Sequence, residues 1–298
     1  MSTRERERAL HYQRRQKFDR ELQSRGAEYS KFAHIRRQAY EKLAHIAGLH
    51  LERLVVEQQK EFSGIELGPF LSKDPKVFLA AYFRTERFQH ATTLAQQALR
   101  TAPSLPNFKG RLAGKLVEEM AYCRVAAVLS AAGGNSGVVL APERTLEFYT
   151  SLHPGRKEQG DLFAFQRLSG ISVPDGVIVT DQGDRRQIAG IIEAKALRFD
   201  DDQYLQTYRT YTAALRQERK DFPDLFSRNP HIYYVTLAPE NEHHALPTIA
   251  LRKNVTFLSL PLTHKQLWPV VETVHQSLRR EPHPRNNHRA DPTDLDKR

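Results

Sequence analysis

The chain has 298 residues, of which 40% are hydrophobic and 27% are charged. This composition is typical of a globular protein and excludes collagen-like, coiled-coil and wholly disordered chains, while the length allows one large domain or one domain with a long extension. The formal net charge of +10 at pH 7 predicts attraction to polyanions. Nucleic acid is the commonest of these, ahead of anionic membranes and acidic proteins.

Cysteine content and the distribution of apolar residues indicate the cellular compartment. Cys123 is the single cysteine, so no disulfide can form within the chain, and its place in a helical apolar pattern predicts a buried thiol. The N-terminus is charged where a signal peptide would be apolar, and no window approaches the ~20 apolar residues of a membrane span. We therefore expect a soluble, cytoplasmic protein without a membrane partner.

Residues 1–104 are expected to form a basic, all-helical N-terminal region. Within residues 3–62, apolar side chains recur at helical spacing without a proline, and Gly26 and Gly48 are candidate breaks between two helical segments. Residues 1–37 carry eleven Lys or Arg against five Asp or Glu. A solvated helix face would explain this charge, and so would contact with DNA phosphates or with a protein partner.

A second helical stretch precedes the boundary between the two expected parts of the chain. Asp74 followed by Pro75 predicts an N-cap with proline at the first helical position, opening a helix that runs to about Leu99. The sequence TAPSLPNFKG then interrupts the helical pattern with two prolines and a glycine. We therefore expect the second domain to begin near residue 105.

Residues 105–280 are expected to form an α/β domain with a mixed sheet between helices. A long amphipathic helix from about residue 110 ends at Gly133 and Gly134. Beyond it the apolar period changes to two in five short segments. These segments, which predict strands, are GVVLAP, VPDGVIVT, RQIAGIIEAKAL, HIYYVTLAP and NVTFLSLP.

Two further helices and a tail complete the predicted order of elements. One helix is expected at residues 201–222, between the third and fourth strands, and the other at residues 263–280, after the fifth. Trp268 in the last helix is expected to be a core residue. Residues 281–298 lack an apolar face and are expected to be a disordered tail.

The second and third strands carry the residues that suggest a chemical role. ISVPDGVIVT enters a turn at DQGD and returns as RRQIAGIIEAKAL, which predicts an antiparallel hairpin. With the turn centred near Gly183, Asp175 lies roughly opposite Ile191 and one diagonal neighbour from Glu193. Glu193 and Lys195 share a face because side chains alternate along a strand. Two carboxylates and an ammonium group therefore converge at one end of the sheet.

A divalent cation would relieve the repulsion between two carboxylates placed so close together. The carboxylates of Asp175 and Glu193, the main-chain carbonyl of Ala194 and retained waters are oxygen ligands that suit Mg²⁺. Such an ion would activate water and stabilise charge on a phosphoryl oxygen, and Lys195 would orient the water or share that stabilisation. The expected reaction is phosphodiester hydrolysis. The alternative interpretation is a plain hairpin in which Glu193 and Lys195 form an ion pair facing solvent.

The hairpin residues resemble a nuclease signature. Asp175 after a proline, followed beyond the hairpin by the triplet Glu193, Ala194 and Lys195, is similar to the motif of the PD-(D/E)xK superfamily, which includes many restriction endonucleases, Holliday-junction resolvases and RecB-like nucleases. The family core has a leading helix, a three-stranded meander that carries the motif, and then a helix and further strands. The resemblance implies a restriction-endonuclease-like α/β/α fold over about residues 110–280, with Asp175 and Glu193 as metal ligands and Lys195 as the catalytic lysine.

The resemblance also implies a further carboxylate on the leading helix. In many members a glutamate there completes the metal site, and Glu118, four residues after Gly114, matches that position best. Glu119 is a close rival. Because adjacent residues lie about 100° apart around a helix, only one of the two can face the site.

The helix after the lysine strand carries a weaker similarity to RecB-like members, some of which have a glutamine and a tyrosine there. In this chain the spacing departs from the usual pattern, and the tyrosines are expected either to pack in the core or to stack on bases. The residues concerned are Gln203, Tyr204, Gln206, Tyr208 and Tyr211.

The function implied is that of a magnesium-dependent DNA endonuclease, restriction-like and acting in defence or repair, in which Mn²⁺ can substitute for Mg²⁺. Two alternatives remain open: an RNA nuclease with the same site, and a catalytically inert nucleic-acid-binding or assembly module of the same fold. Besides nucleic acid, we consider a protein partner bound through the N-terminal helices and a homodimer.

Overall fold

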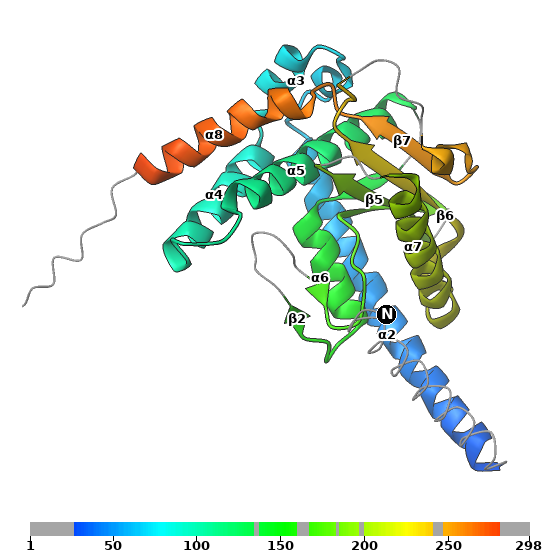
Figure 1. Cartoon of the computed structure of the whole chain (residues 1–298). Helices are drawn as coiled ribbons and strands as arrows, with labels where there is room; N and C mark the ends of the chain where they lie inside the picture. Colours follow the sequence, from blue (N-terminus) through cyan, green and yellow to red (C-terminus); the bar gives the residue numbers. More distant parts are fainter. Residues whose placement is uncertain are drawn as a thin grey trace, which may run out of the picture.

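The structure is a computed structural model (Figure 1). It describes residues 27–133, 137–159, 167–182, 185–196, 200–240 and 247–280. Residues 1–26, which hold most of the basic N-terminal segment, and residues 281–298, expected as a tail, lie outside the described residues.

The helices and strands form an α/β fold, which is the expected fold class. The helices are α2 (Ala27–Phe62), α3 (Pro75–Tyr82), α4 (Glu86–Thr101), α5 (Phe108–Ala131), α6 (Pro142–Leu152), α7 (Asp201–Asp221) and α8 (His264–Arg280), with short 3-10 helices η1 (Gly68–Leu71) and η2 (Thr248–Leu251). The strands are β1 (Val138–Leu140), β2 (Glu158–Gln159), β3 (Arg167–Leu168), β4 (Gly176–Gln182), β5 (Arg185–Lys195), β6 (Phe226–Thr236) and β7 (Val255–Ser259).

A five-stranded mixed sheet forms the centre of the molecule, in the order β1-β4-β5-β6-β7. β1, β4 and β5 are antiparallel neighbours, whereas β5, β6 and β7 run parallel. β2 and β3 form a separate two-stranded ribbon. The predicted strands of the α/β domain and its mixed sheet are thus confirmed.

Helices cover both faces of the sheet because its strands are apolar on both sides. Ile178 and Ile192 point into a core shared with α3, α4, α5 and α8. Val177 and Ile191, their alternating neighbours, point into a second core shared with α2, α6 and α7. Figure 1 shows α7 on the opposite side of the sheet from α4 and α8.

The N-terminal helices share both cores with the sheet. Leu51 and Leu54 of α2 belong to the same core as Val177, and Phe78 of α3 belongs to the same core as Ile192. The part of α2 nearest the N-terminus extends beyond the other helices (Figure 1). The described parts of residues 1–104 therefore pack as additional layers, and whether the two parts fold separately stays a prediction.

Two expected helix boundaries in this region are wrong. Gly48 lies inside the continuous α2, where a Cβ would only touch Leu225 at 3.6 Å, so the glycine is tolerated without a break. The helix opened by Asp74, whose side chain does accept from Lys76 N as an N-cap, ends at Tyr82. Thr85 then caps α4 by accepting from Phe88 N, which starts a new helix.

A helix that was not expected, α6, follows β1. Proline stands at its first turn, where the missing N–H costs nothing, and its apolar residues pack into the core shared with α2. α6 and the β2–β3 ribbon separate β1 from β4 along the chain, although β1 and β4 still pair in the sheet. The meander is therefore interrupted between its first and second strands.

The β4–β5 hairpin differs in register from the expected one. Val179 pairs with Ile188, but Ile178 pairs with Gly190, so Ala189 has no partner on β4 and forms a bulge. Val177 consequently pairs with Ile191. Continued along the strands, this register sets Asp175 opposite Glu193, two residues beyond the expected Ile191. One residue of the shift comes from the register at the turn and the other from the bulge.

Two single-residue expectations have opposite outcomes. Cys123 is a buried free thiol, as expected. Trp268, expected in the core, is 39% exposed and stacks on His264 with ring centroids 5.5 Å apart, because the buried side of α8 is formed by Leu267 and Val271. Among the described helices, none combines the length and the apolar character that crossing a bilayer requires.

Candidate active site

Asp175 lies immediately before β4 and contacts β5 on both sides of Glu193. Its backbone N donates to Ile192 O at 3.0 Å, and its Oδ2 accepts from Ala194 N at 2.7 Å. Both contacts follow from the shifted register, which brings the end of β5 alongside Asp175. The carboxylate of Asp175 is therefore fixed beside that of Glu193.

Glu193 is the centre of a group of polar side chains at the end of β5. Its Oε1 forms an ion pair with Lys195 Nζ, and its Oε2 accepts from the hydroxyl of Tyr211 on α7 at 2.5 Å. The Glu193 side chain is 7% exposed, whereas the Lys195 side chain, nearer the end of the strand, is 23% exposed. The ion pair thus has one buried partner and one partner that solvent or a ligand can reach.

The two glutamates of α5 face different surroundings. Glu118 interacts electrostatically with both Asp175 and Lys195. Glu119 is fully buried on another side of the helix, where it contacts Arg87 of α4. Glu118, the preferred of the two from the resemblance, is therefore the one that the structure brings to Asp175.

Charge repulsion and burial oppose ionisation in this cluster. Burial is the main cause that raises the pKa of Asp175 well above its ordinary value, and the charges of Glu193 and Glu118 raise it further. Burial also raises the pKa of Glu118, against the opposing effect of Lys115. Lys195 responds differently: burial alone would lower its pKa, but Glu193 and Asp175 outweigh burial and raise it. The cluster holds more carboxylates than adjacent ammonium groups.

The donor set of the cluster suits a hard divalent cation. Asp175, Glu193 and Glu118 offer carboxylate oxygens, and Ala194 lies between Glu193 and Lys195 in the strand, where its carbonyl is a further candidate. A cation beside Asp175 would oppose the burial and the like charges that raise its pKa. These are residue types that Mg²⁺ prefers as ligands, although the described residues whose ligand atoms lie within 4.8 Å of one another are His90, Glu119 and Glu143.

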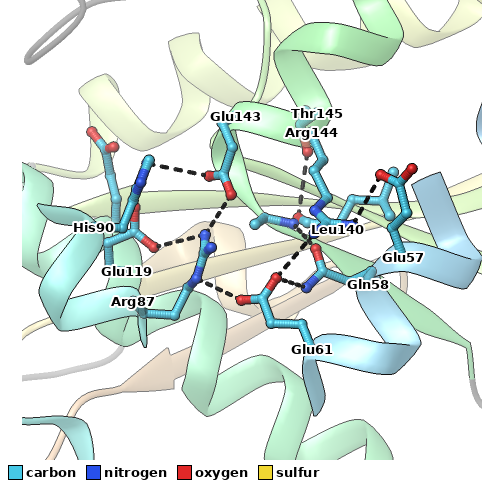
Figure 2. A network of polar contacts seen from close by, with 12 residues as sticks. Glu57, Gln58, Glu61, Arg87, His90, Glu119, Leu140, Glu143, Arg144 and Thr145 are labelled. Carbon is cyan, nitrogen blue, oxygen red and sulfur yellow. Dashed lines mark hydrogen bonds and ion pairs between the residues drawn. The ribbon is translucent and has the colours of Figure 1, made fainter. Parts of the chain in front are cut away.

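A second charged cluster, which includes Glu119 of α5, is centred on the buried Arg87 (Figure 2). Its guanidinium contacts three carboxylates: Nε lies 2.8 Å from Glu61, and Nη1 lies 2.6 Å from Glu143 and 3.6 Å from Glu119. Lys115 also contacts Glu119, at 3.0 Å. The carboxylates come from α2, α5 and α6 and the guanidinium from α4, so the cluster connects four helices.

Neutral and cationic side chains complete this second cluster. Gln58 of α2 donates to Glu61 at 2.8 Å and accepts from Ala141 N at 3.0 Å, and Arg144 lies 3.3 Å from Glu61. His90, Glu119 and Glu143 have side-chain atoms close enough together to ligate one metal ion. Arg87, however, already places a cation between Glu119 and Glu143, so these two carboxylates are neutralised without a metal.

Sequence reasoning undervalued Tyr211 and missed the Arg87 cluster. Among the three tyrosines of α7, Tyr204 packs in the core, and Tyr208 donates to Asn254 at 3.2 Å. Tyr211 alone of these three binds Glu193. Its position seven residues after Tyr204, on the same side of the helix, is the signal that could have suggested an inward-facing hydroxyl.

Comparisons of this chain with protein-family models, with curated proteins and with solved structures found no match. The chemistry of the two clusters therefore carries the functional argument.

Proposed function

We propose that this protein is a magnesium-dependent nuclease that hydrolyses phosphodiester bonds of DNA. The observation that carries the proposal is the convergence of Asp175, Glu193 and Lys195 at the end of β5, with Glu118 beside them and an excess of carboxylates. Structural ion pairs are usually balanced, whereas a site that binds a cation needs uncompensated carboxylates.

The order of elements also supports a restriction-endonuclease-like fold and membership of the PD-(D/E)xK superfamily. α5 leads, β1, β4 and β5 follow as antiparallel neighbours, and α7 connects to β6, which is parallel to β5. Asp175 immediately precedes the second of these strands, and Glu193 and Lys195 lie on the third, an arrangement that supports the proposed signature. The interruption by α6 is a departure that leaves the pairing of β1 with β4 intact.

Each side chain has a role that its position suggests. Asp175, Glu193 and the Ala194 carbonyl would hold Mg²⁺, with Glu118 completing the set. When bound, the ion neutralises charge on the phosphoryl oxygen and makes a water molecule more acidic. Lys195 would donate a hydrogen bond to the attacking water or to the phosphoryl group, because it is the partly exposed partner of its ion pair. Tyr211 would orient Glu193 through its hydroxyl.

A cleavage assay of the full chain tests the proposal. Supercoiled, linear and single-stranded DNA and RNA would each be incubated with protein in Mg²⁺, Mn²⁺ or EDTA. We expect cleavage of DNA that depends on the metal and that is lost in Glu193→Gln. Asp202→Asn is the matched control, because Asp202 is an exposed carboxyl at the start of α7.

The outcomes separate the three functions considered. Metal-dependent cleavage of RNA alone would establish the RNA nuclease instead. Binding of nucleic acid without turnover in either metal would favour the inert module. Full metal-dependent activity in Glu193→Gln would show that cleavage does not come from this site.

A further inference from the structure

A basic cleft of about 820 Å³ lies away from the candidate active site, between the C-terminal half of α7, the first half of β6 and the segment before β7. Its lining includes five cationic side chains: Arg216, Arg219 and Lys220 from α7, Arg228 from β6 and Lys253. No Asp or Glu is among its lining residues.

An irregularity of β6 shapes one wall of the cleft. Ile188 of β5 pairs with Phe226 and Gly190 pairs with His231, so five steps along β6 correspond to two steps along β5. The intervening residues leave the regular ladder, and among them Arg228 and Asn229 are exposed. The extra residues of β6 therefore place Arg228 in the wall of the cleft and outside the regular ladder of the sheet.

Within the described part of the chain, none of the five cleft cations forms an ion pair, unlike the cations around Arg87. A basic last turn favours the helix dipole, which would explain Arg219 and Lys220 at the end of α7. The dipole does not explain Arg228 and Lys253, which come from other elements and face the same space. Five converging unpaired cations indicate a polyanionic ligand.

We propose that this cleft binds the phosphodiester backbone of nucleic acid at a position separate from the phosphate that is cleaved. The proposal rests on the proposed nuclease function. Tyr234, three residues after the cleft residue His231, pairs with Glu193 of the active site. At a rise of about 3.3 Å per strand residue, the two places are about 10 Å apart along β6, or about three nucleotide steps of one strand.

The chemistry of the lining favours recognition of phosphates over bases. Guanidinium groups bind phosphate oxygens through paired hydrogen bonds, and three of the five cations are arginines. The ring of Tyr208 is already engaged, since its hydroxyl donates to Asn254 and the Arg252 guanidinium lies 5.8 Å from its centroid. Binding in the cleft should therefore be independent of base sequence.

The test is equilibrium binding of fluorescent DNA duplexes of two unrelated sequences, measured in EDTA at several salt concentrations. The test variant combines Arg216→Glu, Arg219→Glu and Arg228→Glu. The control variant combines Arg100→Glu, Arg279→Glu and Arg280→Glu, which changes the net charge equally at exposed positions on α4 and α8. A parallel set with Gln in place of Glu covers the case in which charge reversal unfolds the protein, which circular dichroism would reveal.

The expected result is a loss of affinity for both sequences in the cleft variant, by about two orders of magnitude near 0.15 M salt, and a salt dependence shallower by about 0.9 per lost phosphate contact. The control variant should retain most of the affinity and the slope. Equal losses in the two variants, or an unchanged slope in the cleft variant, would overturn the proposal.

This binding test is separate from the test of the nuclease. If the wild-type protein binds DNA through the cleft but never cleaves it, the proposed function fails and the cleft proposal holds. If the wild-type protein cleaves DNA but the cleft variant binds with an unchanged slope, the cleft proposal alone fails.

Discussion

The two charged clusters at α5 differ in how their carboxylates are paired. Glu119 belongs to a cluster in which Arg87 contacts three carboxylates, Lys115 contacts Glu119, and Arg144 contacts Glu61 and Glu57. Glu118, its neighbour in sequence, pairs with Lys115 at 3.3 Å and interacts electrostatically with Asp175 and Lys195. Adjacent residues of one helix thus face two different charged clusters and share Lys115 as a partner.

Carboxylates with a matched charge and carboxylates with an unmatched charge are expected to have different roles. A buried carboxylate whose charge is matched holds helices together, and removing it leaves its partners uncompensated. A carboxylate whose charge is unmatched raises the free energy of the folded state until a cation binds. Substitutions in the two clusters should therefore have opposite effects on stability and on activity.

The largest expected effect is on cleavage by Asp175→Asn. The change removes a charged ligand but keeps an oxygen that can accept from Ala194 N, so the fold should remain intact. Cleavage should fall to the level of the EDTA control, as measured by initial rates in saturating Mg²⁺. Melting curves recorded in parallel serve as the control for folding, and a rate above a few per cent of wild type would contradict the ligand role.

The next largest effect is expected for Lys195→Ala. Loss of the ammonium group should lower turnover by about 10²–10³-fold, because its proposed contribution is to charge that develops in the transition state. DNA binding measured in Ca²⁺ should change little. A large loss of affinity with unchanged turnover would instead assign Lys195 to ground-state binding.

A stability difference between the two glutamates of α5 is the third prediction. Glu119→Gln should destabilise the protein by about 3–5 kcal/mol, since it leaves Arg87 and Lys115 short of a buried partner. Glu118→Gln, the matched change one residue away, removes one partner of Lys115, which keeps Glu119, so it should cost less stability than Glu119→Gln and should reduce cleavage. Urea unfolding of both variants measures this, and equal destabilisation would remove the distinction between the clusters.

The smallest effect concerns pH. The pKa of Asp175 is raised in the folded state, so its favourable contribution is complete below the ordinary value of 3.8 and is lost as the pH rises toward the folded pKa. Asp175→Asn has no carboxyl group to ionise at this position, so its stability does not fall in this way as the pH rises. In EDTA, the variant should therefore gain a few degrees in melting temperature over wild type as the pH rises from 4 to 7. Mg²⁺ should reduce the difference in melting temperature between variant and wild type at pH 7. A difference that becomes smaller as the pH rises without metal would contradict the prediction.

The sequence was most informative where a short-range rule applied. Alternation along a strand was enough to place Glu193 and Lys195 on one face, and the apolar segments around them were confirmed as β4 and β5. The choice between Glu118 and Glu119 stayed open because a helical pattern does not state which of two adjacent residues faces the sheet. The structure places Glu118 there through the packing of α5 against β5.

Long-range features escaped prediction for a different reason. The Arg87 cluster joins residues from four helices that are remote in sequence, and no local pattern brings Glu61 to Glu143. α6 was missed because its apolar residues fall in a short segment between strands. The exposed ring of Trp268 shows the same limit, because an aromatic residue in an amphipathic helix can lie at the edge of its buried face.

The bulge at Ala189 takes up one residue of β5 without changing which side of the sheet the last residues of the strand occupy. Ile188 and Ile191 are three residues apart and still point into the same core because the bulge absorbs one step between them, and Glu193 and Lys195 follow Ile191 in that alternation. Deleting Ala189 would leave Ile188 and Ile191 two residues apart in a regular strand, so Glu193 and Lys195 would keep their side of the sheet. Deleting one residue of the regular ladder, such as Ile192, would instead turn both side chains away from Tyr211 and toward the core beneath α5. A single deletion should therefore be tolerated at the bulge and damaging beyond it.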